Sequence, residues 1–107
     1  MTVASPFQPK RGANQKVTAT TTSQNITIGV DNKSLRIINA GAQVIYFRTY
    51  KASDGAQTAT NADTPVAVSG AAGSVLIIEK SALHDTLAYI ADSATAVCHF
   101  QPGEGGM

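Results

Sequence analysis

Residues Gly73–Ile90 read Gly-Ser-Val-Leu-Ile-Ile-Glu-Lys-Ser-Ala-Leu-His-Asp-Thr-Leu-Ala-Tyr-Ile, and this stretch decides the class of fold. Its first part, Val75–Ile78, is the most apolar run in the chain, and Thr86–Ala91 combines β-branched and aromatic residues. Both compositions are typical of β-strands, and the polar residues Lys80–Asp85 between them favour a short crossing. We therefore expect two strands here, with their apolar residues in a hydrophobic core.

The same signals recur along the chain at roughly ten-residue spacing, with turn residues between them. No segment has helical periodicity, and none is long enough for the crossover that a parallel sheet requires. The sequence therefore predicts an all-β chain, a single small antiparallel β-sandwich or barrel, jelly-roll-like, with about eight short strands. The expected strands are Lys16–Thr22, Gln24–Val30, Ser34–Asn39, Gln43–Tyr50, Pro65–Ser69, Val75–Ile78, Thr86–Ala91 and Thr95–Phe100.

A length of 107 residues favours one domain, which we place at residues 16–101. Residues 1–15 contain Pro6 and Pro9 and show no periodicity, so we expect an extended N-terminal arm. Residues 102–107 begin with Pro-Gly, where we expect the last strand to end and a flexible C-terminal tail to follow. The polar segment Lys51–Thr64 is either a mobile tip or a binding surface.

The composition limits the classes of partner. Charged residues make up only 14% of the chain, which suits a surface that packs against neighbouring chains. The net charge of +1 gives no reason to expect nucleic acid or an acidic membrane as a partner. No apolar run reaches the length of a membrane span, and the N-terminus lacks the pattern of a signal peptide. We therefore expect a protein made and assembled in a cytosol.

No set of residues has the spacing of a catalytic or metal-binding motif. The single cysteine, Cys98, lies in an apolar strand and is expected to be buried. The two histidines, His84 and His99, match no zinc pattern, and the aspartates stand mostly at turn positions. We therefore expect no enzymatic activity, no catalytic residue, no cofactor and no metal.

The order of the strands and turns carries a resemblance. From Val17 to Gly105 the chain resembles the small β-sandwich structural proteins of tailed bacteriophages and prophages, which are virion, minor capsid or capsid-decoration components. The likeness lies in the order of elements and contains no catalytic signature. The segments that carry it are Leu35–Gly41, Val44–Arg48, Thr64–Val68, Gly73–Ile78, Thr86–Ala91, Thr95–Phe100 and the terminal Pro102-Gly103-Glu104-Gly105.

This resemblance implies a non-enzymatic virion structural protein, such as a capsid decoration (cement) or minor capsid protein that stabilises the head shell. Its partners would be major capsid subunits or other virion proteins and further copies of itself, as a dimer or trimer. It would lie on the capsid surface after assembly in the cytoplasm of a bacterial host. The alternatives are a head–tail connector or tail component, and a carbohydrate- or receptor-binding β-module.

The candidate contact residues are apolar and basic side chains of the arm, together with outward-facing side chains of the strand at 43–50. In the alternative carbohydrate-binding module, the segment Lys51–Thr64 and the tyrosines would form the contact face. The candidate interface residues are Val3, Phe7, Lys10, Arg11, Val44, Tyr46, Arg48 and Tyr50.

Overall fold

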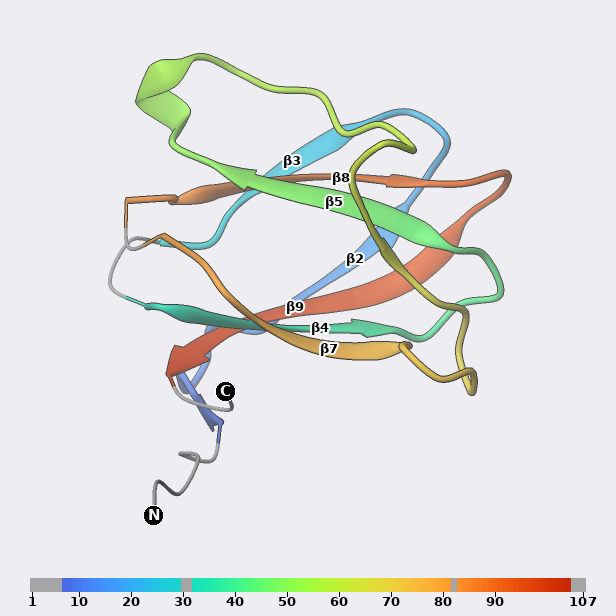
Figure 1. Cartoon of the computed structure of the whole chain (residues 1–107), viewed down its shortest axis with the longest axis horizontal. Coiled ribbons are helices and arrows are strands. Elements are labelled where there is room, and N and C mark those ends of the chain that lie inside the picture. Colours follow the sequence, from blue (N-terminus) through green and yellow to red (C-terminus); the bar gives the residue numbers. More distant parts are fainter. Residues whose placement is uncertain (1–6, 30–31, 82, 105–107) are drawn as a thin grey trace.

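The structure of the chain is a computed structural model that describes residues 7–29, 32–81 and 83–104. Two antiparallel sheets pack face to face (Figure 1). The first, which we name the β9 sheet, consists of β1 (Gln8–Pro9), β2 (Gln15–Ala19), β9 (Ala96–Glu104), β4 (Ser34–Asn39) and β7 (Val75–Glu79). The second, the β8 sheet, consists of β3 (Gln24–Thr27), β8 (Thr86–Ala91), β5 (Ile45–Tyr50) and β6 (Thr64–Val66).

The strand order identifies the sandwich as a jelly roll. In one sheet β9 pairs with β4 on one side and with β1 and β2 on the other, and β7 follows β4. In the other sheet the order is β3-β8-β5-β6. The chain passes repeatedly from one sheet to the other, which is how two interleaved Greek keys form a jelly roll. The all-β sandwich prediction is confirmed.

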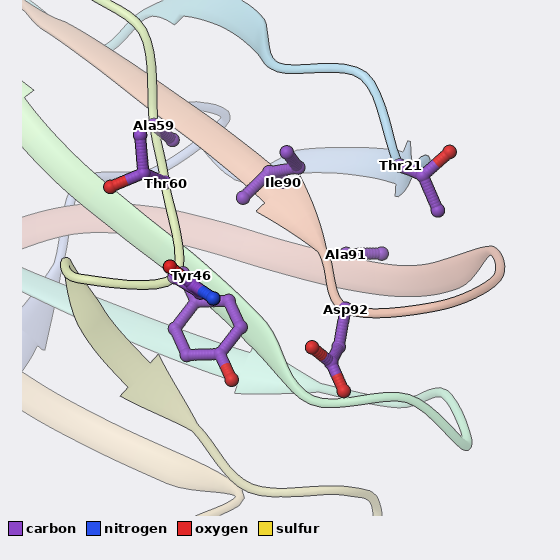
Figure 2. Close-up of a pocket in the computed structure, with 8 residues that line it drawn as sticks. Thr21, Tyr46, Ala59, Thr60, Ile90, Ala91 and Asp92 are labelled. Atoms are coloured by element: carbon purple, nitrogen blue, oxygen red, sulfur yellow. The ribbon is translucent and has the colours of Figure 1, made fainter.

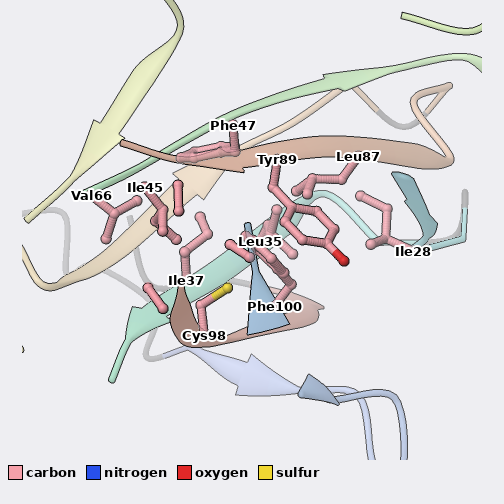
Figure 3. Packing of buried hydrophobic residues seen from close by; sticks show 13 residues of the cluster. Ile28, Leu35, Ile37, Ile45, Phe47, Val66, Leu87, Tyr89, Cys98 and Phe100 are labelled. Carbon is pink, nitrogen blue, oxygen red and sulfur yellow. The ribbon is translucent and has the colours of Figure 1, made fainter. Parts of the chain in front are cut away.

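The core lies between the sheets and follows from the alternation of each strand (Figure 3). Leu35 and Ile37 of β4 point inward, and so do Ile45 and Phe47 of β5. Phe100 of β9 is fully buried, and its ring centroid lies 5.4 Å from that of Tyr89 and 6.4 Å from that of Phe47. This aromatic group joins the two sheets at their centre.

The stretch Gly73–Ile90 forms two strands, as predicted, but not all of its apolar residues lie in the core. Its two strands lie in different sheets, because β7 pairs with β4 whereas β8 lies between β3 and β5. β7 is also an edge strand, and Val75 is 53% exposed. The expectation that all of its apolar residues belong to the core is therefore wrong. Leu76 and Ile78 pack against the core, while Val75 and Ile77 alternate to the outer face.

The expectation that the last strand ends before Pro102 is also wrong, since β9 continues to Glu104 and Pro102 is buried. The reason lies in the direction of the missing N–H group. The hydrogen bond from Ala40 N–H to Val97 O shows that alternate residues of β9, from Val97 to Gly103, bond to β4. Pro102 is out of phase with these residues, so its ring removes no bond to β4. Residues 105–107 lie outside the described residues.

Part of the predicted arm belongs to the β9 sheet. β1 pairs antiparallel with the end of β9, with Gln8 opposite Glu104 and Pro9 opposite Gly103. The N–H of Lys10 also donates to Pro102 O over 2.9 Å, and β2 begins at Gln15. The predicted boundary between arm and sandwich at residue 15 is therefore corrected, because residues 8–9 already form sheet pairs. Residues 1–6, and Val3 with them, lie outside the described residues.

Candidate functional site

The described candidate interface residues fall on two separate parts of the molecule. Phe7, Lys10 and Arg11 lie beside the C-terminal end of β9, and Lys10 and Arg11 are exposed. The other four, Val44, Tyr46, Arg48 and Tyr50, belong to β5 or precede it, in the opposite sheet. The structure therefore does not bring the predicted set together into one surface.

Phe7 packs against its own domain. The guanidinium carbon of Arg36 lies 5.1 Å from the centroid of the Phe7 ring, which is a cation–π contact. A side-chain carbon at Gly103 would lie only 2.6 Å from Cζ of Phe7, so this glycine makes room for the ring. Phe7 therefore packs against the β9 sheet of its own chain, a role that differs from the anchor on a neighbouring chain expected from the sequence.

The segment 51–64 is packed on the outer face of the β8 sheet. Arg48 of β5 holds the segment through a bidentate ion pair with Asp63, in which Nη2 lies 2.8 Å from Oδ1 and Nε lies 3.1 Å from Oδ2. Ala59 is buried in a small cluster with Tyr50 and Ala88, and its N–H donates to Ser23 Oγ over 2.8 Å. The side chain of Arg48 thus serves first to hold this segment.

The prediction that Tyr50 is an interface residue is wrong. Only 4% of its surface is exposed, because the segment 51–64 covers it, and its hydroxyl donates to Asn25 Oδ1 over 3.0 Å. Apolar residues on both faces of a strand indicate that it is covered on both sides, and here the segment 51–64 lies on the outer face. Tyr50 is part of that second covered face.

The Arg48–Asp63 pair makes stability depend on pH. Burial alone raises the pKa of Asp63, but hydrogen bonds from Arg48 and from the Thr60 N–H, with the charge of Arg48, outweigh it and lower the pKa. The carboxylate therefore stabilises the fold above its unfolded pKa of about 3.9, and this contribution is lost as pH falls through the lower folded value. We expect Asp63→Asn to be less stable than the parent at pH 7, and this difference to shrink as the pH is lowered from about 3.9 toward about 2. Urea titrations at the two values measure this, and an equal difference at both would contradict it.

A cavity of about 290 Å³ opens between this segment and the β8 sheet. The ring of Tyr46 lines it, with Ile90 and Ala91 of β8 as its apolar wall (Figure 2). Asn61, Thr60 and Asp92 add polar groups at its rim. Within the described chain, no side-chain hydrogen bond is formed by the Tyr46 hydroxyl or the Asp92 carboxylate. Tyr46 is therefore a predicted contact residue that lines a cavity.

The outer face of the β9 sheet carries an apolar patch that the sequence analysis missed. Ile38 of β4 lies opposite Val75 of β7 on one side and opposite His99 of β9 on the other. Because Leu35, Ile37 and Cys98 point inward, their strand neighbours point outward. On this face Val75 is 53% exposed, whereas Ile38, Ile77 and Val97 are partly buried. We name it the outer patch, and it consists of Ile38, Val75, Ile77 and Val97.

The signal for the outer patch was present in the sequence. Consecutive apolar residues at 37–38 and at 75–78 place apolar side chains on both faces of a strand. A strand of this kind is normally covered on both sides, yet here the outer face is only partly covered within the chain. The sequence alone predicts a core position for the whole run, because no local signal identifies β7 as an edge strand.

The remaining candidates for chemistry are a buried thiol and two hydrogen-bonded histidines. Burial raises the pKa of the Cys98 thiol to about 12, and the side chain is fully buried, as expected for a small core residue. His99 shares a hydrogen bond of 3.1 Å between its Nδ1 and Asn14 Nδ2, and His84 shares one of 2.9 Å between its Nδ1 and Thr49 Oγ1. Among residues 7–29, 32–81 and 83–104, no three metal-ligating side chains come together.

Over the same part of the chain, no helix has the length and apolar character needed to cross a bilayer. Comparisons with protein-family models, with curated proteins and with solved structures found no match for this chain.

Proposed function

We propose that the chain is a non-enzymatic structural protein of a bacteriophage virion, a capsid decoration or minor capsid protein that packs on the head shell. The observation that carries this proposal is the outer patch, a set of apolar side chains on the outer face of the β9 sheet, where Val75 is 53% exposed. Apolar surface of this kind gains free energy when another chain covers it. The jelly roll supports the proposal by analogy, because the fold is frequent in viral capsid proteins.

The distribution of polar groups agrees with docking through the β9 sheet. The opposite β8 sheet already has its outer face partly covered by the segment 51–64, held by the Arg48–Asp63 pair. On the β9 sheet, Arg36 lies beside the patch, where its Nη2 donates to Gln101 Oε1 and its guanidinium lies over the Phe7 ring. An apolar centre with polar groups around it is the usual composition of a protein–protein interface.

A second candidate function, a carbohydrate-binding module, is favoured by the cavity at Tyr46. Its lining combines an aromatic ring with a carboxylate, an amide and hydroxyls, a mixture of donors and acceptors that suits a neutral sugar. In the virion this module would bind a surface glycan. Exposure of the protein to a glycan array distinguishes this candidate, since binding that is lost in Tyr46→Ala would support it.

The first proposal is tested on particles produced from a phage genome that carries this chain. We expect quantitative mass spectrometry of purified particles to find the protein in a fixed ratio to the major capsid protein. Particles from a genome with the gene deleted should release their DNA at a lower temperature, because the added contacts no longer reinforce the shell. Absence of the protein from purified particles would contradict the proposal.

A further inference from the structure

The free edge of β7 has a defined hydrogen-bonding pattern. Asn39 N–H donates to Ser74 O and Lys80 N–H donates to Lys33 O, both in the register that pairs β4 with β7. In an antiparallel ladder only alternate residues bond to a given neighbour. The even-numbered residues of β7 therefore face β4, and the N–H and C=O groups of Val75, Ile77 and Glu79 point away from the sheet. No described strand pairs with them.

The other edges of the sandwich are protected against pairing in ways that β7 is not. β6 is only three residues long and contains Pro65. β3 has exposed polar residues at three of its four positions, and β2 exposes Lys16. Short length, proline and lysine are the usual devices that keep an edge strand from adding a further strand. β7 contains no proline or lysine, and its one charged residue, Glu79, stands at its end.

We propose that β7 pairs antiparallel with β7 of a second copy of this chain, about a two-fold axis at Leu76, so that two β9 sheets form one continuous sheet. This inference rests on the proposed function, since the edge of β7 borders the outer patch that the proposed function uses. In this register Val75 of each copy lies opposite Ile77 of the other, and both residues present free backbone groups. Their N–H and C=O groups then form four intermolecular hydrogen bonds.

Side chains and charge favour a second copy as the occupant of this edge. The register places apolar residues of the outer patch opposite each other, so the patch continues across the joint sheet. The two Glu79 carboxylates lie at opposite ends of the paired strands, where they do not repel each other. A net charge of +1 on each copy gives little long-range repulsion between copies.

The size of the contact sets its strength. A five-residue strand is about 17 Å long, so the edge alone is smaller than the standard interface of a stable dimer. We therefore expect a dissociation constant in the micromolar to millimolar range for the purified protein. On a shell that holds both copies side by side, the same contact is reinforced by avidity.

Proline substitutions test the backbone bonds directly. The N–H of Ile77 points away from β4, so Ile77→Pro leaves the bonds within the chain intact while removing two of the four between copies. We expect sedimentation equilibrium to show dimers of the parent and at least about a tenfold rise in the dissociation constant for Ile77→Pro. The matched control, Ile77→Ala, loses the side chain but keeps the N–H group, and should weaken dimerisation less. Thermal unfolding of both variants confirms that the fold is retained.

Cysteine crosslinking tests the register without relying on proline. At the two-fold axis the two Leu76 Cα atoms would lie about 4.5 Å apart, within the range of a disulfide. We expect Leu76→Cys to form a covalent dimer on mild oxidation and Ile77→Cys to form none. The native Cys98 does not interfere because it is fully buried. Crosslinking of Ile77→Cys but not Leu76→Cys would overturn the inference.

Different results would contradict the β7 dimer and the virion role. A parent protein that stays monomeric up to about 1 mM, yet is present in particles, would overturn the β7 pairing and leave the virion role standing. A protein that dimerises as described but is absent from particles would overturn the virion role alone. Dimerisation that is equally strong in Ile77→Pro would also overturn the pairing.

Discussion

Replacing Phe100 by alanine should lower the free energy of unfolding by about 3–5 kcal/mol, the usual cost of removing a buried aromatic side chain. The ring is fully buried and contacts Phe47 and Tyr89 of the opposite sheet, so its loss leaves a cavity at the joint of the two sheets. Domains of this size have a total stability of about 5–15 kcal/mol, so the variant should be unfolded in part at physiological temperature. Urea denaturation followed by circular dichroism measures the change.

Phe7→Ala is the matched control for this substitution. It removes the same side chain from a half-buried position whose main contact is the Arg36 guanidinium. An exposed cation–π contact contributes about 0.5–1 kcal/mol, so we expect a much smaller loss than at Phe100. Equal losses for the two variants would contradict the position of the core between the sheets.

Placing a charge in the outer patch should abolish docking without unfolding the chain. Ile38 is half-buried in the middle of the patch, between Val75 and His99 on the neighbouring strands. In Ile38→Lys the free protein can extend the new ammonium group into water, whereas a docked protein must bury it without a partner. We expect at least about a hundredfold loss of affinity for shells that lack the protein, measured by co-sedimentation.

Thr27→Lys gives the same change of charge on the other sheet. Thr27 is an exposed residue of β3, which pairs with β8 on the far side of the sandwich. We expect this variant to bind shells as the parent does, because its lysine stays in water. If the two variants were equally impaired, net charge and not the outer patch would explain the loss. Normal binding of Ile38→Lys would place the contact elsewhere.

The strands with the clearest alternation could be predicted from the sequence alone. Ser34–Asn39 and Thr86–Ala91 begin and end where the pattern places them. The partners of each strand could not be predicted, because pairing is set by contacts between distant residues and leaves no local signal. The end of β9 could not be predicted for the same reason. Whether Pro102 ends the strand depends on which neighbouring strand its backbone nitrogen faces, and it does not face β4.

The contact surface was harder to predict than the fold. Tyr50 and Arg48 point outward from β5 as the alternation indicates, but the segment 51–64 folds over them. Conversely, Val75 belongs to the most apolar run in the chain and is 53% exposed, because β7 lies at an edge. Alternation gives the direction of a side chain within its strand, whereas neighbouring strands and the segments that fold over the sheet determine whether that side chain is covered.

The most direct test of the proposed function is a cryo-electron microscopy reconstruction of the intact particle, resolved well enough to place each sheet. We expect the jelly roll on the head shell, with Ile38 and Val75 of the outer patch buried against another virion chain. The β8 sheet, with the segment 51–64 on its outer face, should point away from that contact. A reconstruction that contains the protein with its outer patch open to solvent, or that lacks the protein, would contradict the account.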